Sequence, residues 1–136
     1  MGVVAVVGCQ PDDTGAVLLH LNARSDASTA PATYSSSTAA AAFAPDGLVT
    51  LTATSNQGVV TLLLAGPLGQ GDMIALPPAE ERVHFQIRDD GWGNQGGTIE
   101  VLSVNPVIVS FVGVPMVARA GAATGSFVFD GGGTFR

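Results

Sequence analysis

The sequence predicts an all-β fold, a single-domain antiparallel β-sandwich or barrel of about 8–10 short strands. Glycine and proline recur at short intervals along the 136 residues and divide the chain into segments of strand length. Several of these segments alternate between apolar and polar side chains, which is typical of strands with one buried face. No segment of about twelve residues shows a helical period, so we expect less than about a tenth of the residues to be helical.

Residues 48–65 predict a hairpin of two strands. In residues 48–55, apolar residues alternate with threonines, as expected for a half-buried strand. Asn56-Gln57-Gly58 then supplies the chemistry of a tight turn, and residues 59–65 follow as the returning strand. The returning strand is apolar on both faces, which favours a place in the centre of the sheet or beneath a partner.

The cleanest alternation in the chain lies at residues 82–88. Its polar face is formed by Arg82, His84, Gln86 and Arg88, and its other face is apolar. With the inward positions of the other strands, this apolar face defines the expected core. The predicted core residues are Val49, Leu51, Val60, Leu62, Val83, Phe85, Ile87, Ile99, Val101, Val109, Phe111, Phe127 and Phe129.

The C-terminal part of the chain predicts further strands with interruptions. Residues 98–104 form one strand and residues 107–112 another, which we expect to end at Gly113. After an inward-facing Phe pair, the glycines of residues 130–133 predict a break. Residues 134–136 then form a short terminal strand that is suited to edge pairing.

The chain is long enough for one domain with its own core, and we assign residues 1–136 to a single β domain. Residues 1–21 form an N-terminal hairpin or the stump of a signal, and residues 43–136 form the core. Between them, residues 22–42 are almost purely Ser, Thr and Ala. Because this composition is too weakly apolar to make a core alone, we expect a surface loop or an extended arm.

Two interpretations of the N-terminus stay open. Residues 6–9, Val-Val-Gly-Cys, match the lipid-attachment site of a bacterial lipoprotein, but no basic residue precedes Cys9 as a secretory signal requires. Alternatively, residues 3–9 form a buried strand and residues 10–15, which contain Pro, two Asp and Gly, form its turn. In that case Cys9 is a small buried apolar residue.

Composition excludes several classes of protein. Only 12% of the residues are charged, the chain has no Lys, and the net charge of −6 argues against a nucleic-acid-binding surface. The single Cys excludes an internal disulfide. No apolar run reaches the roughly 18 residues that span a bilayer, so we expect no membrane span.

The sequence lacks the motifs of the common catalytic and metal sites. It contains no nucleophile elbow, no phosphate-binding loop and no Cys/His set with zinc spacing. The two histidines, His20 and His84, lie in strand patterns and are interpreted as ordinary strand residues. We therefore expect no enzyme activity, no cofactor and no metal.

Residues 89–97, DDGWGNQGG, form a glycine-rich segment that we expect to be a loop. The candidate residues for contact with a partner or ligand are Asp89, Asp90, Trp92 and Asn94. Carboxylate and amide oxygens are ligands for Ca²⁺, and an indole stacks on sugars or partners, but the spacing is not that of an EF-hand. A wide hairpin loop with Trp92 folded over the edge of the core is the structural alternative.

These observations favour a non-enzymatic assembly subunit, such as a small virion protein (capsid decoration or tail), a filament protein or a surface-array protein. Its partners would be further copies of itself or other subunits, with residues 22–42 and 134–136 at the interfaces, in a virion or at the cell surface. The alternative is a secreted or lipid-anchored bacterial β-sandwich binding module. In its strands and glycines the C-terminal half, TIEVLSVNP…GSFVFDGGGTF, resembles small secreted β-sandwich lipoproteins of bacteria, a resemblance that transfers no site residue.

Overall fold

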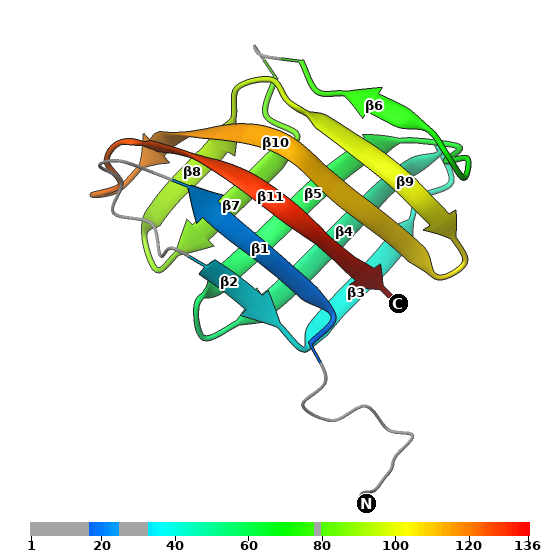
Figure 1. Cartoon of the computed structure of the whole chain (residues 1–136), viewed down its shortest axis with the longest axis horizontal. Helices are drawn as coiled ribbons and strands as arrows, with labels where there is room; N and C mark the ends of the chain where they lie inside the picture. Colours follow the sequence, from blue (N-terminus) through cyan, green and yellow to red (C-terminus); the bar gives the residue numbers. More distant parts are fainter. Residues whose placement is uncertain (1–16, 25–32, 78–79) are drawn as a thin grey trace, which may run out of the picture.

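A computed structural model of the chain describes residues 17–24, 33–77 and 80–136. In these residues, 11 β-strands form a single antiparallel sheet that is nearly closed into a barrel, and no helix occurs (Figure 1). The predicted all-β fold is therefore confirmed. The two interpretations of residues 3–15 and of Cys9 lie outside the described residues.

The sheet follows one continuous path around the barrel. In chain order, the strands are β1 (Leu19–Arg24), β2 (Thr33–Ser36), β3 (Thr38–Phe43), β4 (Leu48–Ser55), β5 (Gly58–Ala65), β6 (Met73–Ala75), β7 (Val83–Ile87), β8 (Asp90–Asn94), β9 (Thr98–Val104), β10 (Val107–Ala120) and β11 (Ser126–Phe135). Their order in the sheet is β2-β1-β11-β10-β8-β7-β5-β4-β3, while β9 pairs with β10, and β6 pairs with β9. The long strand β10 therefore serves two neighbours, β9 along its first half and β8 along its second.

Backbone and side-chain hydrogen bonds bring the two ends of the sheet together. The Arg136 amide donates to the Ala39 carbonyl at 3.1 Å, and the Ala41 amide donates to the Arg136 carbonyl at 2.9 Å. Nearby, the Ser36 hydroxyl donates to the Thr54 carbonyl at 2.6 Å, which ties β2 to β4. These bonds satisfy backbone groups that an open sheet would leave exposed at its edges.

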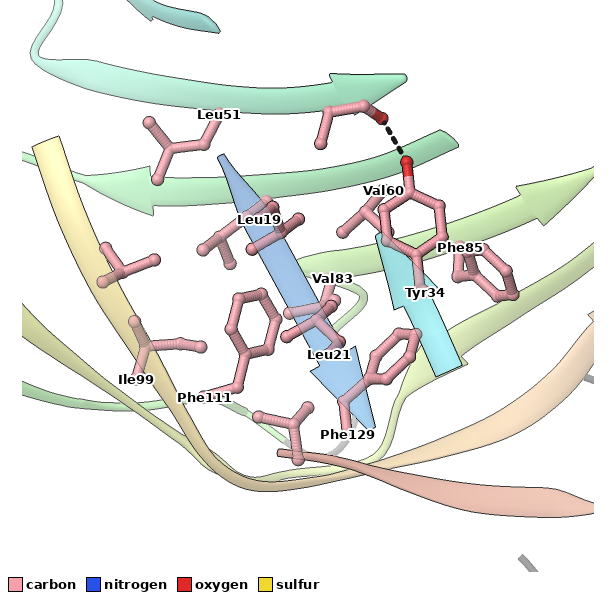
Figure 2. Packing of buried hydrophobic residues seen from close by; sticks show 14 of the residues in the cluster. Leu19, Leu21, Tyr34, Leu51, Val60, Val83, Phe85, Ile99, Phe111 and Phe129 are labelled. Carbon is pink, nitrogen blue, oxygen red and sulfur yellow. Dashed lines mark hydrogen bonds between the residues drawn. The ribbon is translucent and has the colours of Figure 1, made fainter. Parts of the chain in front are cut away.

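The interior of the barrel is filled by apolar side chains from all around the sheet (Figure 2). Phe85 lies in an aromatic cluster, with its ring centroid 5.6 Å from Tyr34, 5.7 Å from Trp92 and 5.6 Å from Phe129. Every predicted core residue is buried except Ile87, which is half-buried at the end of β7 and packs against the core. The alternation of the strands therefore identified the inward face correctly.

The described part of residues 22–42 is neither a loop nor an arm, which corrects the prediction from composition. It contains the end of β1 and all of β2, followed by most of β3. Tyr34 anchors β2 in the core, and Ala39 is the buried residue of β3. Small and β-branched residues fit a strand that packs closely on its neighbours, so a low hydrophobicity did not prevent order here.

The terminal strand is not an edge strand, and the glycines of residues 130–133 do not interrupt it. β11 continues through them and pairs with β1 on one side and β10 on the other. A Cβ atom added to Gly131 would clash with the His20 carbonyl, and one added to Gly133 would clash with the Leu18 carbonyl. The glycines are therefore required by the close approach of neighbouring backbones within the sheet.

β10 also continues where a strand end was predicted. Its register with β11 shifts between Phe111 and Val114, and Gly113 adopts a positive φ of 64°. The Gly113 amide donates to the Asp130 carboxylate at 2.9 Å. Gly113 thus belongs to a β-bulge that bends the long strand from one set of partners to the next.

Candidate functional site

The predicted glycine-rich loop contains a strand, β8, which lies between β7 and β10. The glycines of β8 are covered by one side chain from β7 and one from the segment that precedes β7. A Cβ atom on Gly93 would lie 2.7 Å from Glu81 Cδ, and one on Gly91 would lie 3.2 Å from His84 Cε1. The outer positions of β8 are glycine because Glu81 and His84 occupy the space that its side chains would need.

Trp92, predicted as a surface contact or as a cover over the core edge, lies inside the barrel. Its side chain is only 1% exposed and stacks on Phe85 at an interplanar angle of 27°. The ring of Phe127 packs against its other side, with centroids 5.8 Å apart. The indole Nε1 has no hydrogen-bond partner among the described residues, so burial of Trp92 carries a desolvation cost that its packing must offset.

Asn94 is fully buried and bridges two segments of backbone. Its Oδ1 accepts hydrogen bonds from the amides of Arg82 at 2.6 Å and Val83 at 2.9 Å. Its Nδ2 donates to the Pro77 carbonyl at 3.2 Å and more weakly to the Glu80 carbonyl. The amide therefore holds the entrance of β7 against the end of β8, which is a structural role.

The two aspartates lie at the turn between β7 and β8. Asp90 Oδ1 accepts a hydrogen bond of 2.7 Å from the Ala122 amide, which fixes the turn between β10 and β11. Asp89 is exposed. The structure thus divides the four predicted contact residues: Trp92 and Asn94 are buried, Asp90 is half-buried, and Asp89 is exposed. In the residues that the structure describes, no group of three or more His, Cys, Asp or Glu lies together as metal ligands would.

The outer faces of β5 and β7 form a surface groove of about 440 Å³, which we name the polar groove. It is lined by Ser55, Asn56, Gly58, Val59, Thr61, His84, Gln86, Ile87 and Arg88. Thr61 and His84 are direct partners in the register of β5 and β7, so they lie side by side on its floor. The sequence placed His84, Gln86 and Arg88 on one polar face, but it did not bring them together with residues 55–61.

A chain of polar contacts fixes the side chains of the polar groove. His84 Nδ1 contacts Glu81 Oε2, and His84 Nε2 lies 3.2 Å from Gln86 Oε1. Gln86 in turn donates from Nε2 to the Arg88 carbonyl at 2.8 Å. Glu81 and His84 remain partly exposed, so this chain of contacts is open to solvent along its length. The other histidine, His20, is exposed on β1 and shares a hydrogen bond of 2.7 Å with Ser35 Oγ.

A second surface lies on β6, β9 and the first half of β10, and we name it the apolar face. Its exposed large side chains are Met73, Leu102 and Val112, with exposed fractions of 59%, 45% and 46%. Val104 is also exposed, but it lies opposite the buried Val107 and so belongs to the inner side of the sheet. Glu100 is the only charged residue in β6, in β9 and in residues 107–112. In Figure 1, β6 and β9 lie beside this half of β10, away from β1 and β2.

The fold and these two surfaces define a small antiparallel β-barrel protein with an aromatic core. No family model, no curated protein and no solved structure matches the chain. Where the structure describes the chain, it contains no helix with the length and apolar character needed to cross a membrane.

Proposed function

We propose that this protein is a non-enzymatic structural subunit that assembles with further copies of itself through the apolar face. The observation that carries the proposal is the clustering of exposed apolar side chains. Of the six large apolar side chains exposed in the described residues, three lie on this face, and the others are Val17, Phe43 and Val104. Large apolar side chains exposed on neighbouring strands are typical of a protein interface.

The edge strand β6 supplies a backbone element for the same contact. Among the described strands, β6 pairs only with β9, so its other edge offers backbone groups for pairing. Two copies related by a two-fold axis can pair their β6 strands antiparallel and join their sheets. Met73 of each copy would then lie beside the joint, and Leu102 would flank it.

The location of the interface differs from the one that the sequence predicted. We expected residues 22–42 and residues 134–136 at the interfaces, but the described parts of both segments pair within the barrel. The proposal therefore rests on the apolar face and on the low charge of the chain, 12% of residues. Such a subunit suits a virion, a tail, a filament or a surface array, and this setting is part of the proposal.

Light scattering coupled to size exclusion, over a range of protein concentrations, tests the assembly. We expect the unaltered chain to be oligomeric and Leu102→Asp to shift it to a monomer, because a carboxylate that flanks the β6 joint would be buried in the interface without a partner. Phe43→Asp is the matched control, since Phe43 is 64% exposed but lies on β3. A monomeric unaltered chain, or equal effects of both variants, would contradict the proposal.

A further inference from the structure

We propose that the polar groove is a binding site for a small ligand that carries a carboxylate next to hydroxyl or amide groups. Arg88 would hold the carboxylate, and the side chains of β5 and β7 would hydrogen-bond the rest. This site lies on strands other than those of the apolar face, and its existence does not depend on assembly.

Arg88 is the residue on which the proposal depends. It follows β7 with a positive φ of 54°, the single non-glycine residue with a positive φ among those that the structure describes. Its guanidinium has no hydrogen bond or ion pair within the described ranges, whereas Arg82 pairs with Glu80 and Arg119 donates to the Asn94 carbonyl. A left-handed backbone is unfavourable for an arginine, and such conformations concentrate at functional sites.

The charge of the groove favours one carboxylate over a phosphate. The guanidinium of Arg88 matches a carboxylate in a two-pronged geometry. The chain contains no Lys and has a net charge of −6, so little further positive charge is available for a dianion. The Glu81 carboxylate beside His84 also makes that end of the groove unsuitable for a second negative group.

The rest of the groove is arranged before any ligand arrives. Gln86 is fixed by its bond to the Arg88 carbonyl, and it holds His84 from one side while Glu81 holds it from the other. Ordered polar groups lose little conformational entropy on binding, which raises affinity. Thr61 adds a hydroxyl beside His84.

The floor and size of the groove limit the ligand class further. Val59 and Ile87 are half-buried and give the floor two apolar patches, which suit the carbon skeleton of a small polar molecule. A volume of about 440 Å³ lies within the range of small-molecule sites, roughly 300–1,000 Å³. No Phe, Tyr or Trp is among the described residues that line the groove, so recognition would depend mainly on the carboxylate. An acidic monosaccharide and an N-acylated amino acid with a single carboxylate both fit this chemistry.

Amide-resolved NMR titration of the full chain tests the site and separates the two ligand sources. The probes are sodium glucuronate, N-acetylglutamine, glucose and inorganic phosphate. We expect saturable shifts of the amides of Thr61, Gln86 and Arg88 with at least one of the two carboxylates. Glucose should produce no saturable shift. The carboxylate that binds with the lower Kd shows whether the ligand is a sugar acid or an acylated amino acid. No saturable shift with either carboxylate, or equal binding of glucose or phosphate, would overturn the proposal.

Two arginine variants show whether the guanidinium of Arg88 itself binds the carboxylate. Arg88→Gln should weaken binding about tenfold, the loss expected for one charge-assisted pair. Arg82→Gln changes the net charge equally but lies outside the groove lining, so it should leave binding unchanged. The emission of the buried Trp92 verifies that both variants are folded. Equal weakening by both variants would show a nonspecific charge effect and refute the site. Whether the protein assembles is measured separately, so either proposal can fail alone.

Discussion

Tyr34 shows how one side chain links the core to the closure of the barrel. Its ring packs edge-on against Phe85 (Figure 2). Its hydroxyl donates to the carbonyls of Ala53 at 3.0 Å and Gly58 at 2.9 Å. β2 is thereby fastened to the β4–β5 hairpin through a side chain instead of a ladder of backbone bonds. This role could not be predicted from the sequence, because a single Tyr in a Ser/Thr/Ala segment has no alternation around it.

We expect the stability of the protein to fall in alkali through Tyr34. Burial raises the pKa of its hydroxyl above the ordinary value of 10.0, and the hydrogen bonds with Ser55 and Ser36 oppose this only in part. The folded state therefore favours the neutral phenol. Its contribution is complete below pH 10.0, the value of the unfolded chain, and is lost as the pH rises through the folded pKa.

Denaturant unfolding at a series of alkaline pH values measures this effect. Because Tyr34 is the only tyrosine, phenolate absorbance reports its titration directly. Tyr34→Phe should remove this component of the pH dependence, although loss of the hydroxyl lowers stability at neutral pH as well. Titration of the folded protein at or below pH 10.0 would show that the hydroxyl is not desolvated as described.

Phe85 should be among the residues whose truncation is most damaging. It is fully buried and contacts four other aromatic rings, those of Tyr34, Trp92, Phe127 and Phe129. Phe85→Ala should lower the unfolding free energy by about 3–5 kcal/mol, because it removes buried surface and leaves a cavity. The exposed Phe43 is the control, and Phe43→Ala should change it by less than about 0.5 kcal/mol. Similar urea midpoints for both variants would contradict the assignment of the core.

At the scale of strands, the sequence predicted those elements whose two faces meet different surroundings. β4 and β7 have a buried face and a solvated one, so their residues alternate visibly. β8 was not predicted because its outer residues are glycines, which neighbouring side chains cover. β3 was not predicted because it has alanine on both of its faces and so shows no alternation. The polar groove could not be predicted as a whole, since Thr61 and His84 become neighbours only through pairing of strands that are distant in sequence.

The glycines of β11 provide a test at this scale. A Cβ atom at Gly133 would collide with the Leu18 backbone. A Cβ atom at Gly71 would meet no atom within 4 Å, but the residue there has a backbone φ of 92°, which is unfavourable for alanine. We expect Gly133→Ala to destabilise the barrel by about 3 kcal/mol or more, because two strand backbones must separate. Gly71→Ala should cost about 1–2 kcal/mol, the strain of a left-handed backbone alone. Thermal melting of both variants compares the cost of the backbone clash with the cost of the left-handed backbone. A smaller fall in Tm for Gly133→Ala than for Gly71→Ala would contradict the close approach of the strands.

At the scale of the whole molecule, closure of the barrel reduces the number of free edges that the protein presents. β3 is bonded to Arg136, and β2 is joined to β4 through side chains, so β6 is left as the more open edge among the described strands. This explains why the proposed assembly centres on β6 and the apolar face. It also explains why the expected contacts at residues 134–136 are internal, since the barrel itself uses those backbone groups.

The pairing of β1 with β11 also has a consequence for the time course of folding. Leu19 lies opposite Gly133, so residues near the two ends of the sequence must find each other before the sheet can close. The long segment between these residues must be ordered for this contact to form, and its conformational entropy is lost before packing of the core stabilises the structure. Topologies of this kind fold over milliseconds to seconds, whereas local hairpins such as β4–β5 form within about 1–10 μs. Until the first and last strands meet, the hairpins formed earlier would expose part of the aromatic core to water.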